Sequence, residues 1–194
     1  MTGKGWLASA GLAMMSAAMA LSAAEPPVTG DAVRFTLTST DFSAGGKLAD
    51  SQVFNGFGCK GANVSPALAW SGAPSATKSF ALLVHDPDAP TGSGWWHWLV
   101  YNIPASVSAL PAGAGDPQKK LLPAGAVQGR TDFGSAAYGG PCPPPGSPHH
   151  YNFRLYALKV AKLNLPANAT AALVSFNVHS QALGEADLTG LYGR

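Results

Sequence analysis

The chain is 194 residues long, with 46% hydrophobic and 11% charged residues and a formal net charge of +2 at pH 7. Because the few charges form no basic block, the composition gives no indication of nucleic-acid binding. The 23 glycines and 16 prolines, in a chain of this apolar content, favour many turns and short strands over disorder.

Residues 1–24 have the pattern of a secretory signal peptide. Lys4 is their only charge, an apolar stretch rich in Ala and Met begins at Trp6, and small residues lead up to Ala24. Cleavage after Ala24 predicts a periplasmic or secreted protein. The alternative is an uncleaved anchor, but the stretch is short and weakly hydrophobic for stable membrane insertion. Residues 25–194 are expected to form one domain with a substantial core.

Four segments have the patterns of β-strands. Residues 33–39 alternate apolar and polar side chains, as a half-buried strand does. Residues 79–84 form a continuous apolar run typical of a buried strand, and residues 97–103 form another, which ends at Pro104. In residues 150–158 the alternation places four side chains on one face: Tyr151, Phe153, Leu155 and Ala157.

One helix pattern appears late in the chain. Asn168 can cap a helix over residues 169–183, and Gly184 can end it. Its expected apolar stripe consists of Leu173, Phe176, Val178 and Leu183. Strands first and a helix late predict a mainly β protein, a sandwich with a peripheral C-terminal helix.

The glycines at 56, 58 and 61 match the dinucleotide-binding pattern G-x-G-x-x-G. That pattern functions only where it follows a strand and opens a helix. Here residues 63–66 end in a proline that blocks a long helix, so we predict no nucleotide site.

Cys59 and Cys142 are the two cysteines of the chain. An even number of cysteines in an exported protein favours a disulfide, which here would close a long loop. Two separate buried thiols are the alternative. A zinc site is less favoured, because neither cysteine has a second Cys or a His at ligand spacing.

The first polar cluster runs from Asp86 through Pro90 to the aromatic run at residues 95–98, which contains His97. Asp86 and Asp88 are two positions apart, so an extended backbone would point both to one side. They could line a site or cap turns; we expect Asp86 to face a site and Asp88 to order the loop. His97 could equally be a hydrogen-bonded core residue.

The second cluster is a proline-rich loop, residues 139–148, followed by His149, His150 and Tyr151. The rigid loop either delivers these side chains to a pocket or is simply a surface loop with solvated histidines. Both interpretations fit the residues alone.

Together the two clusters resemble the phosphatidylethanolamine-binding protein family, and most closely its bacterial Raf-kinase-inhibitor-like branch with exported two-cysteine members. The similarity extends over almost all of residues 25–194 and includes Phe57–Cys59, Asn63–Pro66, Leu68–Trp70 and Gln128–Gly134. It implies an antiparallel β-sandwich with one small anion pocket near the surface. By the family's motif, the pocket residues are Asp86, His97, His149 and Tyr151, with Trp95 and the Pro143–Pro144 backbone as walls.

The family pocket takes phosphate-like groups, including the phosphoethanolamine head group. Imidazole N–H and phenol O–H groups can donate to phosphate oxygens, and amides of the proline loop could add to the site. This sequence departs from the family in three ways. Cys142 stands where eukaryotic members usually have a glycine, His150 replaces a frequent arginine, and the segment between Pro90 and Trp95 is shorter than in eukaryotic members.

These features predict a non-catalytic exported module that binds a small anionic or phosphorylated ligand through Asp86, Asp88, Trp95, His97, Pro144, His149 and Tyr151, without cofactor or metal. The alternative is an inhibitor of a partner protein, such as a kinase or protease, that uses the loops around the pocket. A metal-dependent hydrolase is least favoured, because no nucleophile, base and orienting group occur together in the motifs. Bacterial members are often dimers, so the resemblance also implies a homodimer.

Overall fold

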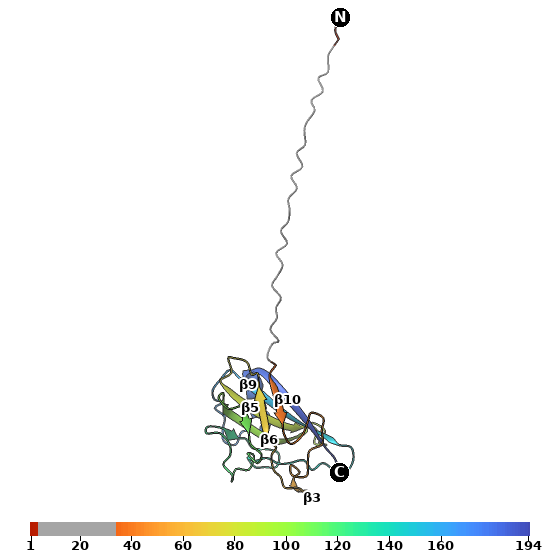
Figure 1. Cartoon of the computed structure of the whole chain (residues 1–194), viewed down its shortest axis with the longest axis vertical. Helices are drawn as coiled ribbons and strands as arrows, with labels where there is room; N and C mark the ends of the chain where they lie inside the picture. The colour runs from red at the N-terminus through yellow and green to blue at the C-terminus, as the bar shows by residue number, and fades with distance from the viewer. Residues whose placement is uncertain (4–33) are drawn as a thin grey trace. The chain divides into compact units, whose positions relative to one another are not determined.

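The computed structural model describes residues 1–3 and 34–194. All of the predicted signal peptide beyond residue 3, including its cleavage site at Ala24, lies outside the described residues. Within the described part, no helix is both long and apolar enough to cross a membrane. Figure 1 shows the long strands of the region from residue 34 onward.

Two sheets form the sandwich. The larger has five antiparallel strands in the order β10-β9-β5-β6-β8, and the smaller has three in the order β1-β4-β7. The strands of the larger sheet are β5 (Ser79–Asp86), β6 (Trp95–Pro104), β8 (Val127–Gln128), β9 (His149–Leu158) and β10 (Ala182–Tyr192). Those of the smaller are β1 (Thr36–Ser39), β4 (Leu68–Ser71) and β7 (Ala109–Leu110). The predicted β-sandwich with a C-terminal helix is confirmed.

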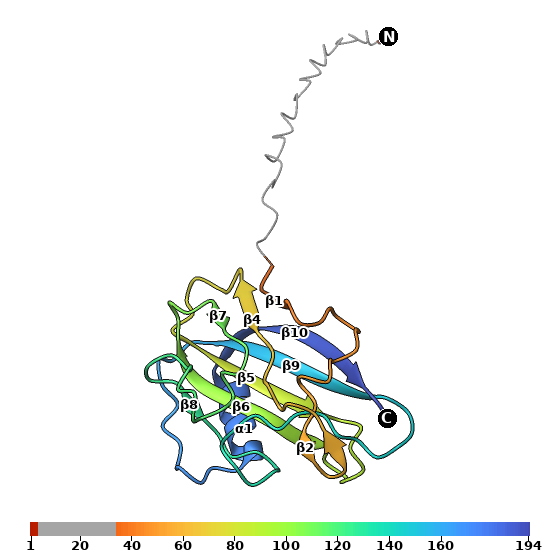
Figure 2. The same cartoon turned by 60° about the horizontal axis from the view of Figure 1, so that its bottom comes forward.

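The larger sheet is buried on both faces, which explains the unbroken apolar run of β5. Phe80, Leu82 and Val84 face the smaller sheet, whereas Ala81 and Leu83 face the helix α1 (Ala171–Gln181). Figure 2 shows α1 behind the long strands and β4 on their near side. The four residues predicted to share a face of β9, from Tyr151 to Ala157, all belong to the core between the sheets.

The helix differs from its prediction in its cap and in its buried face. Its N-cap is Thr170, whose hydroxyl accepts the N–H of Leu173, rather than Asn168. The buried residues are Ala171, Val174 and Val178. Of the predicted stripe only Val178 is buried: Leu173, Phe176 and Leu183 are exposed, by 41%, 71% and 39%. The stripe was wrong because Ala171 and Val174 already fill the face that packs on the sheet.

The end of the chain also differs. The helix stops at Gln181, and residues 182–192 form β10, a strand that the sequence analysis did not predict. It pairs with β9 along its length and supplies one edge of the larger sheet. Two further short strands, β2 (Asn55–Gly56) and β3 (Cys59–Lys60), make a hairpin from the glycine-rich pattern at residues 56–61. This hairpin agrees with the prediction that the pattern opens no helix.

Candidate functional site

A cavity of about 160 Å³ lies where β5 ends and where β6 and β9 begin. Its polar side chains are Asp86, Thr91, His97, His149 and Tyr151. Its other lining residues are Phe57, Ala89, Pro90, Trp95, Phe133, Cys142, Pro143 and Pro144. The structure therefore brings together all but one of the predicted ligand-binding residues, and the exception is Asp88.

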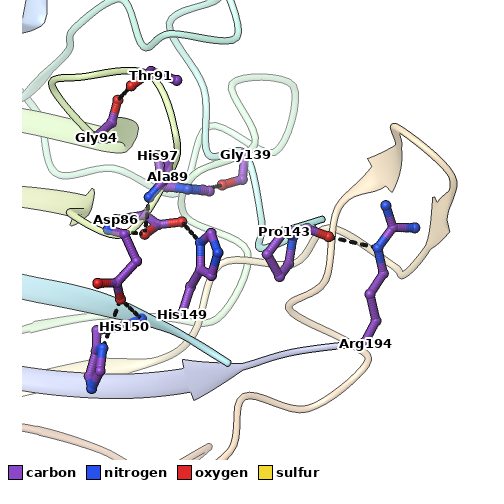
Figure 3. A network of polar contacts seen from close by, with 11 residues as sticks. Asp86, Ala89, Thr91, Gly94, His97, Gly139, Pro143, His149, His150 and Arg194 are labelled. Carbon is purple, nitrogen blue, oxygen red and sulfur yellow. Dashed lines mark hydrogen bonds and ion pairs between the residues drawn. The ribbon is translucent and has the colours of Figure 1, made fainter. Parts of the chain in front are cut away.

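Asp86 combines two functions that the sequence analysis divided between two residues. Its side chain is 4% exposed. Oδ1 accepts the backbone N–H groups of Asp88, at 2.8 Å, and Ala89, at 3.1 Å, and so orders the proline-containing turn. Oδ2 accepts a hydrogen bond from Nδ1 of His149 at 2.8 Å, as Figure 3 shows. Asp86 thus orders its loop and lines the cavity at the same time.

Asp88 lies outside the cavity. Its Oδ2 accepts two hydrogen bonds from His150, one from the backbone N–H and one from Nδ1, both at 2.7 Å. These hydrogen bonds, the backbone one first, lower the pKa of Asp88. Both side chains are about half exposed, at 41% and 56%. Asp88 thus links the loop after β5 to the start of strand β9, beside the cavity rather than in it.

His97 reaches the cavity because β6 contains a β-bulge. Val84 lies opposite Trp98 and His85 lies opposite Trp96, so His97 is an extra residue between the two pairs. Strict alternation would place Trp96 and Trp98 on one face, yet Trp96 packs on the helix side and Trp98 between the sheets. Bulges re-aim side chains in this way.

The imidazole of His97 is fixed by its neighbours. It is 4% exposed and lies edge-on to the rings of Tyr151 and Phe133, with centroids 5.0 and 5.4 Å apart. Its Nδ1 is 2.6 Å from the carbonyl oxygen of Gly139 (Figure 3). Since a carbonyl only accepts, Nδ1 carries the proton. Burial lowers the pKa of His97 to about 4, so the ring is neutral near pH 7.

Tyr151, in β9, carries a buried hydroxyl without a partner. Its side chain is 1% exposed, and its oxygen makes no hydrogen bond to any residue in the described part of the chain. Burial, with the nearby Asp86 carboxylate, raises the pKa of Tyr151, which keeps the hydroxyl protonated as a donor. An unsatisfied buried polar group costs about 1–3 kcal/mol, and a ligand in the cavity would relieve this cost.

The cavity wall from the proline loop is fastened at several points. The predicted disulfide between Cys59 and Cys142 is present, with an S–S distance of 2.05 Å, and joins the loop to the β2–β3 hairpin. Arg194 donates from Nε to the carbonyl of Pro143 at 2.7 Å. The Gly140 N–H donates to Oδ1 of Asn63 at 2.7 Å.

The loop amides contribute less than expected to an anion site. Four of the five residues between Gly140 and Gly146 are prolines, which have no N–H, and only Cys142 has one. The N–H of Gly146 donates to the carbonyl of Arg194. A concave site of successive N–H groups, as anion-binding loops use, therefore cannot form here.

Two aromatic wall residues were missed as site residues. Phe57 lies between β2 and β3, 66% exposed, with a positive φ of 52°, and its ring stacks on Phe133 at 5.9 Å. Phe133 in turn contacts Trp95 edge-on at 5.5 Å. Both lie in loops, where no periodicity marks a side chain as facing a pocket. The one available signal is that Phe57 is two residues from a cysteine of the disulfide.

The charge of the cavity is low. No Lys or Arg is among its lining residues. In the described residues, no three His, Cys, Asp or Glu side chains are grouped so that they could hold a metal ion. The polar groups of the cavity thus include an Asp–His pair, a neutral imidazole and a phenol hydroxyl, and they are surrounded by aromatic and proline side chains.

The comparisons with known proteins agree in one family. The sequence profile of the phosphatidylethanolamine-binding protein family matches residues 38–193. The chain is 52% identical to YbcL of Escherichia coli (strain K12) over 162 residues, which cover 83% of this chain and 88% of YbcL. It is 46% identical to YbhB of the same strain over 156 residues, 80% of this chain and 98% of YbhB. The crystal structure of YbcL, described as a new member of the mammalian PEBP family, superimposes with a TM-score of 0.81 over 82% of this chain and 98% of that one.

Proposed function

The chain belongs to the phosphatidylethanolamine-binding protein family, and from this premise we propose that it is an exported, non-catalytic binding protein whose cavity holds a small oxyanion of the phosphate class. The observation that carries the proposal is the unpartnered hydroxyl of Tyr151, buried in a cavity that also holds the Asp86–His149 pair and His97. A donor left without a partner in a cavity is complementary to an acceptor-rich ligand.

The Asp86–His149 pair supports the same ligand class. Because a carboxylate only accepts, Nδ1 of His149 carries the proton that bonds to Asp86. In its cationic form, His149 has a second N–H at Nε2, and both N–H groups then serve as charge-assisted donors. The pair fixes the ring of His149 at the cavity, which Tyr151 also lines.

Export is proposed from the disulfide together with the signal-like pattern of residues 1–24. Disulfides persist in oxidising compartments, such as the periplasm or the extracellular space, and are rare in the cytosol. The Cys59–Cys142 bridge lies in the cavity wall, so the compartment that maintains the bridge also maintains the site.

Inhibition of a partner protein is the second candidate, favoured by the exposure of Phe57. An apolar ring that is 66% exposed beside the cavity is a surface that a protein partner would cover. Phe57→Ser would then abolish capture of a periplasmic protein that the wild type captures. Equal capture by the variant and the wild type would remove this candidate.

The chain offers a matched pair of variants for the anion proposal. His149 and His150 are adjacent, and each bonds an aspartate through Nδ1, but only His149 lines the cavity. Calorimetric titration with inorganic phosphate and with phosphoethanolamine should show one site in the wild type. His149→Ala should weaken binding at least tenfold, and His150→Ala less than twofold. Circular dichroism establishes that both variants are folded.

The proposal fails if the wild type binds neither compound. It also fails if the two histidine variants bind alike. Should His149→Ala not fold, because it leaves the buried carboxylate of Asp86 without its partner, Tyr151→Phe replaces it in the comparison.

A further inference from the structure

The cavity has one fixed acceptor as well as its donors. Gly139 holds the proton of His97 on Nδ1, so the neutral ring presents a lone pair at Nε2. Nε2 makes no hydrogen bond to any side chain or backbone group that the structure describes, and His97 lines the cavity. A ligand that meets this nitrogen must bring a hydrogen-bond donor of its own.

The cavity also has a free donor, the hydroxyl of Tyr151. The Nδ1–H of His149 is already donated to Asp86, so His149 offers a ligand a donor only when its Nε2 is protonated as well. Both oxygens of Asp86 already accept hydrogen bonds, Oδ1 from two backbone amides and Oδ2 from His149. The site therefore combines donors for oxygen atoms of a ligand with one acceptor for a hydroxyl of the same ligand.

The charges around the cavity set a limit on the charge of the ligand. The lining residues include no Lys or Arg, and the carboxylate of Asp86 lies among them. Three hydrogen bonds stabilise this carboxylate but do not remove its charge. Because Coulomb repulsion is proportional to the charge of the ligand, a singly charged ligand meets half the repulsion from Asp86 that a doubly charged ligand meets.

We propose, on the basis of the anion-binding function above, that the cavity selects a singly charged oxyanion that retains an acidic hydroxyl, such as the monoanion of a phosphate monoester, over a phosphodiester. The hydroxyl of the ligand donates to Nε2 of His97, while another of its oxygens accepts from the hydroxyl of Tyr151. A diester has the same charge but no P–OH group, so its oxygen would face the lone pair of His97.

If His97 were protonated, its Nε2–H could donate to an oxygen of a diester. The surroundings of His97 oppose this protonation. Burial lowers the pKa of His97 to about 4, and His85 in β5 adds to the lowering. The Gly139 carbonyl, Asp86 at the end of β5 and Asp132 in the loop after β8 act in the opposite direction and do not overcome burial. From β9, Tyr151 contacts the ring edge-on, and its raised pKa keeps it uncharged.

Two ligands with the same amine test the selection. Phosphoethanolamine is a monoester with a second phosphate pKa of about 6, and glycerophosphoethanolamine is a diester without one. Calorimetric titration of each into the wild-type protein, from pH 5.5 to pH 8.5, gives the ratio of the two affinities. The two ligands share the amine and differ in the acidic P–OH group, so the ratio of their affinities reports on that group.

The expected ratio at pH 5.5 is at least tenfold in favour of the monoester, the effect of one hydrogen bond in a desolvated site. It should fall as pH rises, because the monoanion loses about a factor of ten in population for each pH unit above its second pKa. Equal affinities at pH 5.5, or a ratio that stays constant or rises with pH, would overturn the inference. Binding of neither ligand at any pH would instead overturn the proposed function.

A pair of histidine variants assigns the selection to His97. His97→Asn retains a side-chain N–H for Gly139 but removes the acceptor at Nε2, so the ratio at pH 5.5 should shrink to less than threefold. His85→Asn is the control, because His85 bonds the carbonyl of Ser93 and does not line the cavity. A His97→Asn ratio equal to that of the wild type would show that selection does not depend on this nitrogen.

Discussion

Asp86 and His149 are 63 residues apart in the chain, yet Oδ2 of the first and Nδ1 of the second lie 2.8 Å apart. β5 and β9 are neighbours in the larger sheet, and their pairing ends with His85 opposite Asn152. Asp86 is the last residue of β5 and His149 is the first of β9, so both lie at the same end of these two antiparallel strands. There the loop after β5 lies beside the proline loop that leads into β9. The sheet register therefore creates the polar part of the cavity from two distant motifs.

The loop after β5 depends on Gly94. Its φ is +74°, and a Cβ atom there would collide with the carbonyl of Asp86 and with the imidazole of His85. We expect Gly94→Ala to lower the free energy of unfolding by at least about 3 kcal/mol, from the left-handed conformation and the displaced backbone together. Urea denaturation measures this value.

Gly92 provides the control for that variant. It has a similar φ of +82°, but a Cβ atom there would meet nothing within 4 Å. Gly92→Ala should therefore cost only the conformational part, about 1–2 kcal/mol. If the two variants have equal stability, the close packing of Gly94 against Asp86 and His85 is not a constraint on the loop.

The buried His97 should make stability depend on pH. Its pKa is about 4 in the folded protein and 6.5 ordinarily, so below pH 6.5 the unfolded chain binds more protons than the folded one. The stabilisation is complete above pH 6.5 and is lost as pH falls towards 4, to a total of about 3 kcal/mol. Urea denaturation at intervals across this range measures it.

His97→Asn isolates this effect, since the variant has no titrating group at position 97. Its loss of stability between pH 6.5 and pH 4 should be smaller than that of the wild type by about the same 3 kcal/mol. If the free energy of unfolding depends on pH in the same way in both proteins, His97 is not buried in a neutral form as described above.

The disulfide should stabilise the fold as well as the cavity wall. It links residues 83 positions apart, and closure of a loop of this length is worth roughly 4 kcal/mol in the chain-entropy description. The double variant Cys59→Ser, Cys142→Ser should lose most of this stability in urea denaturation. A reductant should bring the wild type to the same level and leave the variant unchanged; a response of the variant to the reductant would contradict the assignment.

The buried face of α1 can be tested with two residues of the helix. Val178 is fully buried and Phe176 is 71% exposed. Val178→Ala should lower the free energy of unfolding by about 2 kcal/mol through the cavity that it leaves. Phe176→Ala, although it removes more apolar atoms, should change it by no more than about 0.5 kcal/mol. A loss of about 2 kcal/mol or more in Phe176→Ala would instead support the stripe that the sequence predicts, to which both residues belong.

Sequence patterns predicted the long strands and the residues of both clusters, because alternation and apolar runs report directly on burial. They did not predict β10, where Gly184, Glu185, Asp187 and Gly190 give a segment of low β-propensity. That segment is a strand because β9 offers it a complete set of backbone partners. The helix cap was misplaced by two residues, from Thr170 to Asn168, since both residue types cap well.

The position of His97 shows a second limit of sequence patterns. Alternation along β6 would place it on the side of α1, and the bulge that turns it to the cavity exists only in the pairing with β5. The resemblance to the family predicts His97 in the pocket without knowledge of the strand register. Asp88 shows the opposite case, because spacing put it beside Asp86 but its hydrogen bonds with His150 hold it outside the cavity.

The hydroxyl of Tyr151 is the atom on which the account of the cavity depends most. Tyr151→Phe removes only this oxygen, which has no hydrogen-bond partner in the described structure, so the urea midpoint should stay the same or rise. Calorimetric titration of phosphoethanolamine into the wild type and Tyr151→Phe at pH 5.5 is the most direct test. We predict one site in the wild type and an affinity about 10- to 100-fold lower in the variant, as expected for a lost hydrogen bond to a charged ligand. Equal affinities in the two proteins would contradict the proposal that this cavity binds the anion.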